Sequence, residues 1–172
     1  MDGKSRSTLI WPSVIALAVI LLDQATKVWA VANLTGQPSR KIVGELVMFT
    51  LVYNEGGAMG TRLGSTDYYT VMALLILPFI AYYLWRNRFE RVIAWPLAFI
   101  LGGAIGNLID RIRLGRVVDF IDVDMPDINL SFFQLDRWWT FNIADAAITC
   151  SIVFLLLHML LVKKAAPPAP GS

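Results

Sequence analysis

Four long apolar runs constrain this chain of 172 residues more than any other feature of its sequence. A helix that crosses a lipid bilayer needs about 20 mainly apolar residues. The first run is too long for a cleavable signal peptide, and prolines within later runs are tolerated in membrane helices. We therefore predict four retained transmembrane helices, at about residues 9–34, 68–85, 92–109 and 143–162.

The composition supports a membrane protein and excludes several other classes. Hydrophobic residues make up 56% of the chain and charged residues only 16%, whereas charged residues approach a quarter of a soluble domain. The length fits one domain, so we expect a single multi-pass membrane domain over residues 1–172, with a disordered tail at 165–172. One cysteine and one histidine do not provide a usual zinc site, and a net charge of +2 does not predict nucleic-acid binding.

The placement of basic residues predicts how the spans are oriented. Cytoplasmic connections of membrane proteins are enriched in lysine and arginine. The two chain ends and the short link between the second and third runs hold seven basic residues and two acidic ones. We therefore expect both termini to be cytoplasmic, and the long connections at about 35–67 and 110–142 to be outside. The basic residues are Lys4, Arg6, Arg86, Arg88, Arg91, Lys163 and Lys164.

The two outer connections contain segments that favour strands. Lys41–Tyr53 is rich in β-branched and aromatic residues, and Val117–Phe133 mixes short apolar runs with Pro126 and several aspartates. Because glycines follow the first segment, we expect a short helix or a gating loop over Gly56–Asp67. The predicted fold is an all-α integral membrane bundle of four helices, with a small extracytoplasmic β-sheet.

Polar residues inside the predicted spans are costly and are functional-site hypotheses by default. Asp23 and Lys27 are four residues apart in the first span, next to Gln24, so they lie on one helix face and can pair. A buried ion pair that fixes helix packing explains them equally well.

The third span ends in a second polar group, within the sequence GGAIGNLIDR. Gly102 and Gly106 form a small-xxx-small pattern, which favours close helix packing. Asn107, Asp110 and Arg111 follow them at the outer end of the span. Contacts with lipid headgroups are an alternative explanation for Arg111 and for Arg116 further along.

The segments VVDFID and FNIAD supply a third group of polar residues. Asp119 has apolar neighbours on both sides, a setting that raises the pKa of a carboxyl group. Asp145 lies in the first turn of the fourth span, and Asn142 is a candidate N-cap of that helix. Asp122, by contrast, resembles a loop or turn residue.

Two carboxyl groups that meet at one point are the best catalytic option in this set. If Asp119 and Asp145 approach within about 3 Å, one of them keeps a proton. The ionised member can then take a proton from water, while the other hydrogen-bonds a scissile carbonyl. This is the chemistry of aspartic proteases, and it needs no metal and no cofactor.

Other chemistries and functions rank below this one. A Ser-Lys dyad would use Lys27 as the base and Ser65 or Ser131 as the nucleophile, but no motif marks either serine. His158 is about 20 Å from Asp145 along one helix, so a Ser-His-Asp triad fails. A small transporter or proton-relay subunit needs polar residues throughout the membrane depth, and an assembly subunit does not explain the two aspartates.

The motifs together resemble those of bacterial lipoprotein signal peptidase, also called signal peptidase II. They occur in that family's order, and the four-span plan covers about residues 9–162. Each motif alone is weak, whereas five in order are specific. They read DQATK from Asp23, NEGGAMG from Asn54, GGAIGNLIDRIRLG from Gly102, VVDFID from Val117 and FNIAD from Phe141.

The resemblance implies an intramembrane aspartic endopeptidase of the bacterial cytoplasmic (inner) membrane, with the active site toward the extracytoplasmic side. Its substrates would be prolipoproteins, cut just before a diacylglyceryl-modified cysteine, and globomycin would bind across the catalytic pair. We expect a monomer surrounded by membrane lipids. By the same resemblance Asp119 and Asp145 are catalytic, and Asn54 and Arg111 contact the substrate backbone. The supporting residues would be Asp23, Lys27, Asn54, Asn107, Asp110, Arg111 and Asn142.

Overall fold

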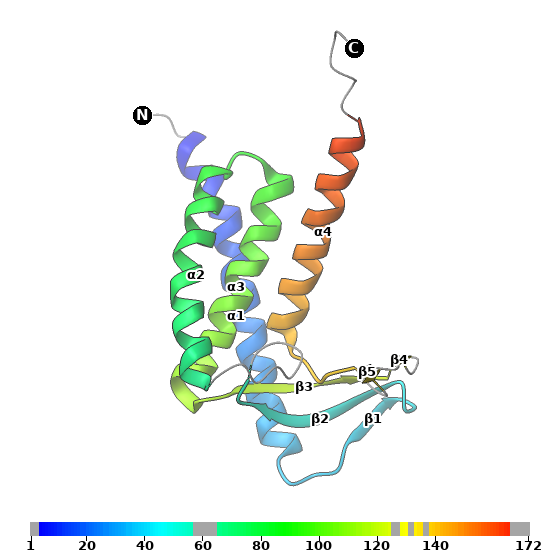
Figure 1. The fold of residues 1–172 in the computed structure, drawn as a ribbon. Helices are drawn as coiled ribbons and strands as arrows, with labels where there is room; N and C mark the ends of the chain where they lie inside the picture. Colours follow the sequence, from blue (N-terminus) through cyan, green and yellow to red (C-terminus); the bar gives the residue numbers. More distant parts are fainter. Residues whose placement is uncertain (1–3, 57–64, 125–127, 131–132, 136–137, 166–172) are drawn as a thin grey trace.

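The structure, a computed structural model, describes all residues except 1–3, 57–64, 125–127, 131–132, 136–137 and 166–172. Four long helices run side by side, and a small sheet lies across one end of them (Figure 1). Each helix contains an apolar stretch long enough to span a membrane, which confirms the predicted bundle of four long apolar helices. The helices are α1 (Lys4–Leu34), α2 (Thr66–Arg86), α3 (Arg91–Leu114) and α4 (Ile143–Ala165).

Helix α3 extends about five residues beyond the predicted end of the third span. Asp110 and Arg111 therefore lie on this helix, and the second long connection begins only at Gly115. Gly115 has a φ of 68° and its N–H donates to the carbonyl of Arg111 at 3.0 Å. A residue without a Cβ atom adopts this left-handed conformation without strain, so the glycine ends the helix and turns the chain toward the sheet.

Helix α3 contacts the other three helices, and its glycines allow the closest approaches. A Cβ atom on Gly102 would lie 2.6 Å from the carbonyl oxygen of Ala16 in α1. A Cβ atom on Gly106 would lie equally close to the carboxylate of Asp23. The predicted small-residue pattern is therefore where α3 packs against α1.

The predicted strand segments form an antiparallel sheet in the order β1 (Arg40–Val43), β2 (Val47–Asn54) and β3 (Val117–Val123). Two short strands, β4 (Ile128–Leu130) and β5 (Phe133–Leu135), form a separate hairpin. The three-stranded sheet packs on the last turns of α1. There Trp29 contacts Phe49 and Phe120 edge-to-face, with ring centroids 5.2 and 6.3 Å apart.

The start of α1, the end of α4 and the link between α2 and α3 lie at the same end of the bundle, opposite the sheet (Figure 1). The segments that the charge pattern assigned to one side are thus together. The expected gating loop falls largely on residues 57–64 and the expected tail on 166–172, and both lie outside the described residues.

Candidate active site

Asp119 and Asp145 come together because the chain runs beside β3 immediately before α4 begins. The N–H of Phe141 donates to the carbonyl of Ile121 at 2.9 Å, and the N–H of Ile121 donates back at 2.8 Å. This bridge places Asn142, the residue that precedes α4, next to Asp119 of β3. Both side chains are buried, with exposed fractions of 0% and 1%.

Asn142 caps α4, as the sequence predicts, and also links the two carboxyl groups. Its Oδ1 accepts a hydrogen bond from the N–H of Asp145 at 2.9 Å, and Oδ2 of Asp145 accepts one from the N–H of Asn142 at 3.4 Å. This reciprocal arrangement is that of a capping box. The Nδ2 of Asn142 donates to Oδ1 of Asp119 at 2.7 Å, so one amide side chain contacts both aspartates.

Asn107 approaches Asp145 from α3, and Lys27 fixes its orientation. The ammonium of Lys27 has no acceptor, so it must donate to Oδ1 of Asn107, at 2.8 Å. The Nδ2 of Asn107 therefore faces Asp145 and donates to its Oδ1 at 2.8 Å. A hydrogen bond of this kind stabilises the ionised carboxylate.

Asn54, at the end of β2, donates a hydrogen bond to Asp119 in the way that Asn107 donates one to Asp145. Its Oδ1 accepts from the N–H of Gly56 at 2.9 Å, which turns the Nδ2 toward Asp119. That Nδ2 donates to Oδ2 of Asp119 at 3.0 Å. Both oxygens of Asp119 thus accept hydrogen bonds from asparagine amides, since Asn142 occupies the other one.

Lys27 is buried, and its ammonium lies 2.9 Å from the carboxylates of both Asp23 and Asp110. The predicted pair of Asp23 and Lys27 is confirmed, with Asp110 as a third member. Asp23 also accepts from the N–H of Ala144 at the start of α4, at 3.0 Å. Asp110 also accepts from the N–H of Val118 in β3, at 3.1 Å. The buried charges therefore hold the two segments that carry the aspartates.

This ion-pair network bears on the alternative Ser-Lys dyad. A Ser-Lys dyad needs a lysine amine within hydrogen-bond reach of a serine hydroxyl. Ser65 lies at the N-cap of α2, whereas Lys27 contacts Asp23, Asp110 and Asn107. Ser131 lies outside the described residues. In the part of the chain that the structure describes, no group of three His, Cys, Asp or Glu side chains is placed to hold a metal ion.

The pKa of Asp119 is raised from 3.8 to about 7, in the direction that its apolar neighbours predict. Burial contributes most to this rise, and the negative charge of Asp145 adds to it. The hydrogen bonds from Asn54 and Asn142 and the charge of Lys27 act in the opposite direction. Asp119 is therefore a carboxyl group that holds a proton close to neutral pH.

Arg111 lies at the margin of this network and contacts three elements. Its guanidinium donates to the carbonyl of Asn107 at 3.5 Å and to that of Gly56 at 3.4 Å. The guanidinium carbon also lies 5.9 Å from the ring centroid of Tyr69 in α2. The structure thus brings all nine residues singled out by the sequence into one connected region.

Some residues of this region were missed or misjudged from the sequence. Gln24 stood among the polar residues but not among the predicted site residues, and its Nε2 donates to Asp110 at 2.9 Å. The interpretation of Asp122 as a loop or turn residue is wrong, because it lies in β3, only 6% exposed, and accepts from the hydroxyl of Thr50. The burial of Asp122 depends on how β2 pairs with β3. Its position three residues after Asp119 in the sequence therefore did not indicate that it would be buried.

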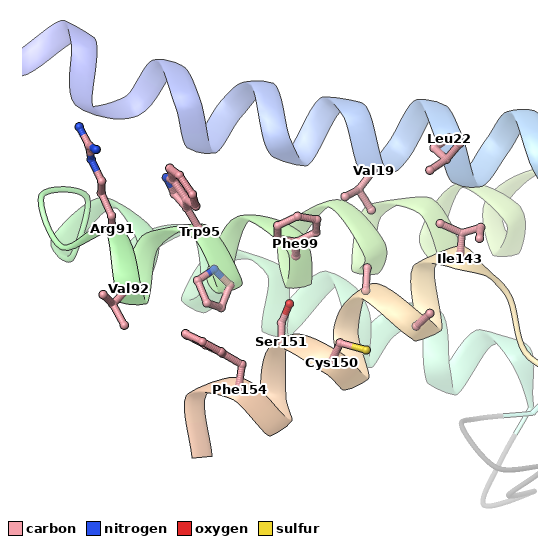
Figure 2. A pocket seen from close by; sticks show the side chains of 13 residues that line it. Val19, Leu22, Arg91, Val92, Trp95, Phe99, Ile143, Cys150, Ser151 and Phe154 are labelled. Carbon is pink, nitrogen blue, oxygen red and sulfur yellow. The ribbon is translucent and has the colours of Figure 1, made fainter. Parts of the chain in front are cut away.

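An apolar groove of about 800 Å³ lies between α1, α3 and α4. Figure 2 shows its lining side chains, with Ile143 at one end and Arg91 at the other. Its end at Ile143 is two residues from Asp145 along α4, although Asp145 itself does not line the groove. Cys150 lines this groove and is exposed.

The second cavity, of about 600 Å³, lies on the sheet side and is lined by both polar and apolar side chains. Asp119 and Asp122 line it together with the end of β2 and the pair Trp138 and Trp139. The two tryptophan rings contact each other edge-to-face at 5.4 Å. From the sequence, these tryptophans fit either anchors at the membrane interface or a cradle for the substrate, and their place in this pocket depends on the fold.

The family model and the named relatives that match this chain indicate one family. A family model described as signal peptidase (SPase) II matches residues 15–161. A protein of Syntrophomonas wolfei named lipoprotein signal peptidase is 36% identical over 86% of this chain and 91% of its own length. One of the same name from Pseudomonas paraeruginosa is 34% identical over 99% of this chain and 98% of its own. A solved structure described as a bacterial membrane enzyme superposes with a TM-score of 0.76, at 25% identity over 94% of this chain and 93% of that one.

Proposed function

Because this chain belongs to the signal peptidase II family, we propose that it is an endopeptidase that removes signal peptides from prolipoproteins. Asp119 and Asp145 form its catalytic aspartic pair, and the cut falls just before a diacylglyceryl-modified cysteine. The observation that carries the proposal is that both carboxyl groups accept a hydrogen bond from Asn142, and that Asp119 lines a pocket on the sheet side.

The reaction uses the single proton that the pair retains near neutral pH. The ionised member takes a proton from a water molecule, whose oxygen attacks the scissile carbonyl carbon. The protonated member donates a hydrogen bond to the carbonyl oxygen and then supplies the proton that the leaving nitrogen needs. The raised pKa of Asp119, about 7, supports its role as a group that keeps a proton in this range.

The supporting residues act on this pair in two ways. Lys27, Asp23 and Asp110 hold the segments that carry the aspartates, and Asn107 and Asn142 orient the carboxyl groups. Asn54 and Arg111 contact the substrate backbone near the cut. Their meeting at Gly56, beside Asp119, supports that assignment.

The apolar groove accommodates the apolar segment of the signal peptide. Its lining comes from three membrane-spanning helices, and it runs from Ile143 to Arg91, toward the end of the bundle that holds the chain termini (Figures 1 and 2). The apolar region of a signal peptide is 7–15 residues long, or about 10–22 Å as a helix. A segment of this length fits beside the bundle while its end reaches the aspartates.

The protein resides in the bacterial cytoplasmic membrane as a monomer surrounded by lipids. Both termini are cytoplasmic, and the aspartic pair faces the extracytoplasmic side. The basic residues of the chain ends and of the link between α2 and α3 support this orientation. Globomycin inhibits the enzyme by binding across the pair.

The proposal is tested by mapping the products of purified protein. A synthetic prolipoprotein segment is offered with and without the diacylglyceryl group on its cysteine, and products are identified by mass spectrometry. We expect one cut, immediately before the modified cysteine, and a rate at least about 100-fold lower without the lipid, since lost binding energy of about 3 kcal/mol has that effect. Equal cleavage of both substrates, or a cut elsewhere, would contradict the proposal.

A further inference from the structure

Arg116 makes a contact that the proposed reaction leaves unexplained. It follows Gly115 at the turn between α3 and β3, and its guanidinium carbon lies 3.7 Å from the ring centroid of Tyr53 in β2. A planar guanidinium stacks on an aromatic ring in a way that an ammonium does not. Arg116 therefore contacts the sheet, rather than only the lipid headgroups that the sequence suggested.

The contact between Arg116 and Tyr53 lies next to Asn54, which donates a hydrogen bond to Asp119. Tyr53 pairs with Val118 and Asn54 pairs with Val117, so the start of β3 runs along the end of β2. Asn54 is the last residue of β2, and its amide donates to Asp119 at 3.0 Å. The stack thus holds the residue that immediately precedes Asn54.

The chain immediately beyond Asn54 is held by hydrogen bonds to its backbone carbonyls. The carbonyl of Glu55 accepts from the hydroxyl of Thr66 at 3.0 Å, and that of Gly56 accepts from Arg111 at the longer distance of 3.4 Å. Since the N–H of Gly56 orients the Asn54 amide, a displacement at this end of β2 moves the donor away from Asp119. The ring of Tyr53, which precedes Asn54 in the chain, is a large side chain next to that point.

We propose that Arg116 is a positioning residue, whose stack on Tyr53 fixes the end of β2 so that Asn54 keeps its hydrogen bond to Asp119. The inference rests on the proposed function, because its consequence appears in the aspartic pair. The bond from Asn54 favours the ionised form of Asp119. When that bond is weakened, the pair keeps its proton to higher pH and the water-activating geometry is less well populated.

The test is a double-mutant cycle on cleavage, measured from pH 5 to pH 9. Arg116→Gln is expected to lower kcat about fivefold to tenfold and to move the alkaline limb of the profile upward by about 0.5 to 1 pH unit. Asn54→Ala shows both effects in full, and the double variant resembles Asn54→Ala. The charged groups that face Asp119 from other elements, namely Asp145, Lys27 and Arg111, stay unchanged in all of these variants.

Two further variants separate stacking from charge. Arg113→Gln removes an exposed charge from the last turn of α3 and should match the wild type. Arg116→Lys keeps the charge without the planar group and should shift the profile in the same direction as Arg116→Gln. The proposal is overturned if Arg116→Gln matches Arg113→Gln, if its effect multiplies with that of Asn54→Ala, or if Arg116→Lys restores the wild-type profile. Failure of the proposed function would instead appear as an Asp119→Asn variant that still cleaves.

Discussion

Lys27 acts on the two aspartates through its neighbours. Its ammonium joins Asp23 and Asp110, and its bond to Asn107 decides which end of that amide faces Asp145. A single buried cation therefore sets both the position of the two segments and the direction of a hydrogen bond. The energetic role of such a residue exceeds that of a surface ion pair.

Replacing Lys27 by methionine tests this role at the scale of one residue. The substitution leaves two buried carboxylates without a cation, which costs about 3–5 kcal/mol when one partner of a buried pair is removed. We expect a lower midpoint of thermal unfolding and cleavage below about 1% of wild type, since Asn107 loses its orientation.

The chain offers a matched control in a second lysine–acid pair at the same spacing. Lys41 and Glu45 are in contact, and their side chains are 59% and 74% exposed. Because exposed pairs contribute about 0–1 kcal/mol, Lys41→Met should leave both stability and cleavage close to wild type. Equal losses of stability and cleavage in the Lys27 and Lys41 variants would show that the burial of the ion pair does not explain the effect of Lys27→Met.

Asp119 also makes the stability of the protein depend on pH. Its pKa in the folded protein is about 7, against 3.8 as the ordinary value, so the folded state binds a proton that the unfolded chain has released. The contribution to stability is complete below about pH 4 and is lost as pH rises through about 7. The unfolding midpoint of the wild type should fall between pH 5 and pH 8 by more than that of Asp119→Asn. Parallel curves would contradict the raised pKa.

Residue-level prediction from the sequence succeeded where the signal is local. Asn142 was predicted as a cap because it lies three residues before Asp145 in the chain. Asp122 was misjudged because its burial depends on a partner 72 residues away, the hydroxyl of Thr50. The roles of the nine site residues in catalysis remain predictions.

At the scale of elements, the sequence located the four helices. It indicated which segments form strands, but not how those strands pair. Apolar runs of about 20 residues identify spans by length alone, and the glycines of α3 indicated its packing. The pairing of β2 with β3 contains a register shift between Phe49 and Val52, which no local pattern encodes. That shift determines that Val52 is opposite Asp119.

The groove between α1, α3 and α4 gives a prediction at this scale. Cys150→Trp places a large ring in the groove and should lower cleavage at least about 10-fold, because it excludes the apolar segment of the signal peptide. Ile152→Trp adds the same ring to an exposed position of α4 that does not line the groove, and should cleave at nearly the wild-type rate. Equal activities of the two folded variants would show that the groove does not bind the signal peptide.

At the scale of the whole molecule, the basic chain ends and link lie at one end of the bundle, and the buried polar cluster with the two aspartates lies at the other. Most of the buried polar residues, including Asp23, Lys27 and Asn107, contact one another next to the sheet, whereas the basic chain ends and link lie away from it (Figure 1). A proton relay across the membrane would need polar groups along the full length of the bundle. The clustering at one end favours chemistry at one membrane face instead.

The orientation of the bundle can be measured with single cysteines in a Cys150→Ala background. Glu45 lies in the turn between β1 and β2, and Glu90 in the link between α2 and α3, and both are exposed. In intact cells with a permeabilised outer envelope, a membrane-impermeant maleimide should label Glu45→Cys and leave Glu90→Cys unlabelled until the membrane is lysed. The reverse pattern would invert the proposed topology.

The central claim, that Asp119 and Asp145 perform the cleavage, is tested most directly by the two asparagine variants. Purified Asp119→Asn and Asp145→Asn are compared with the wild type on a diacylglyceryl-modified prolipoprotein, after thermal unfolding has shown that each is folded. Asp124→Asn is the control, because Asp124 follows β3 and lines neither cavity. We predict that the variants Asp119→Asn and Asp145→Asn each lose at least about 10³-fold in kcat, while Asp124→Asn cleaves normally. Near-normal cleavage by either folded dyad variant would contradict the two-aspartate mechanism.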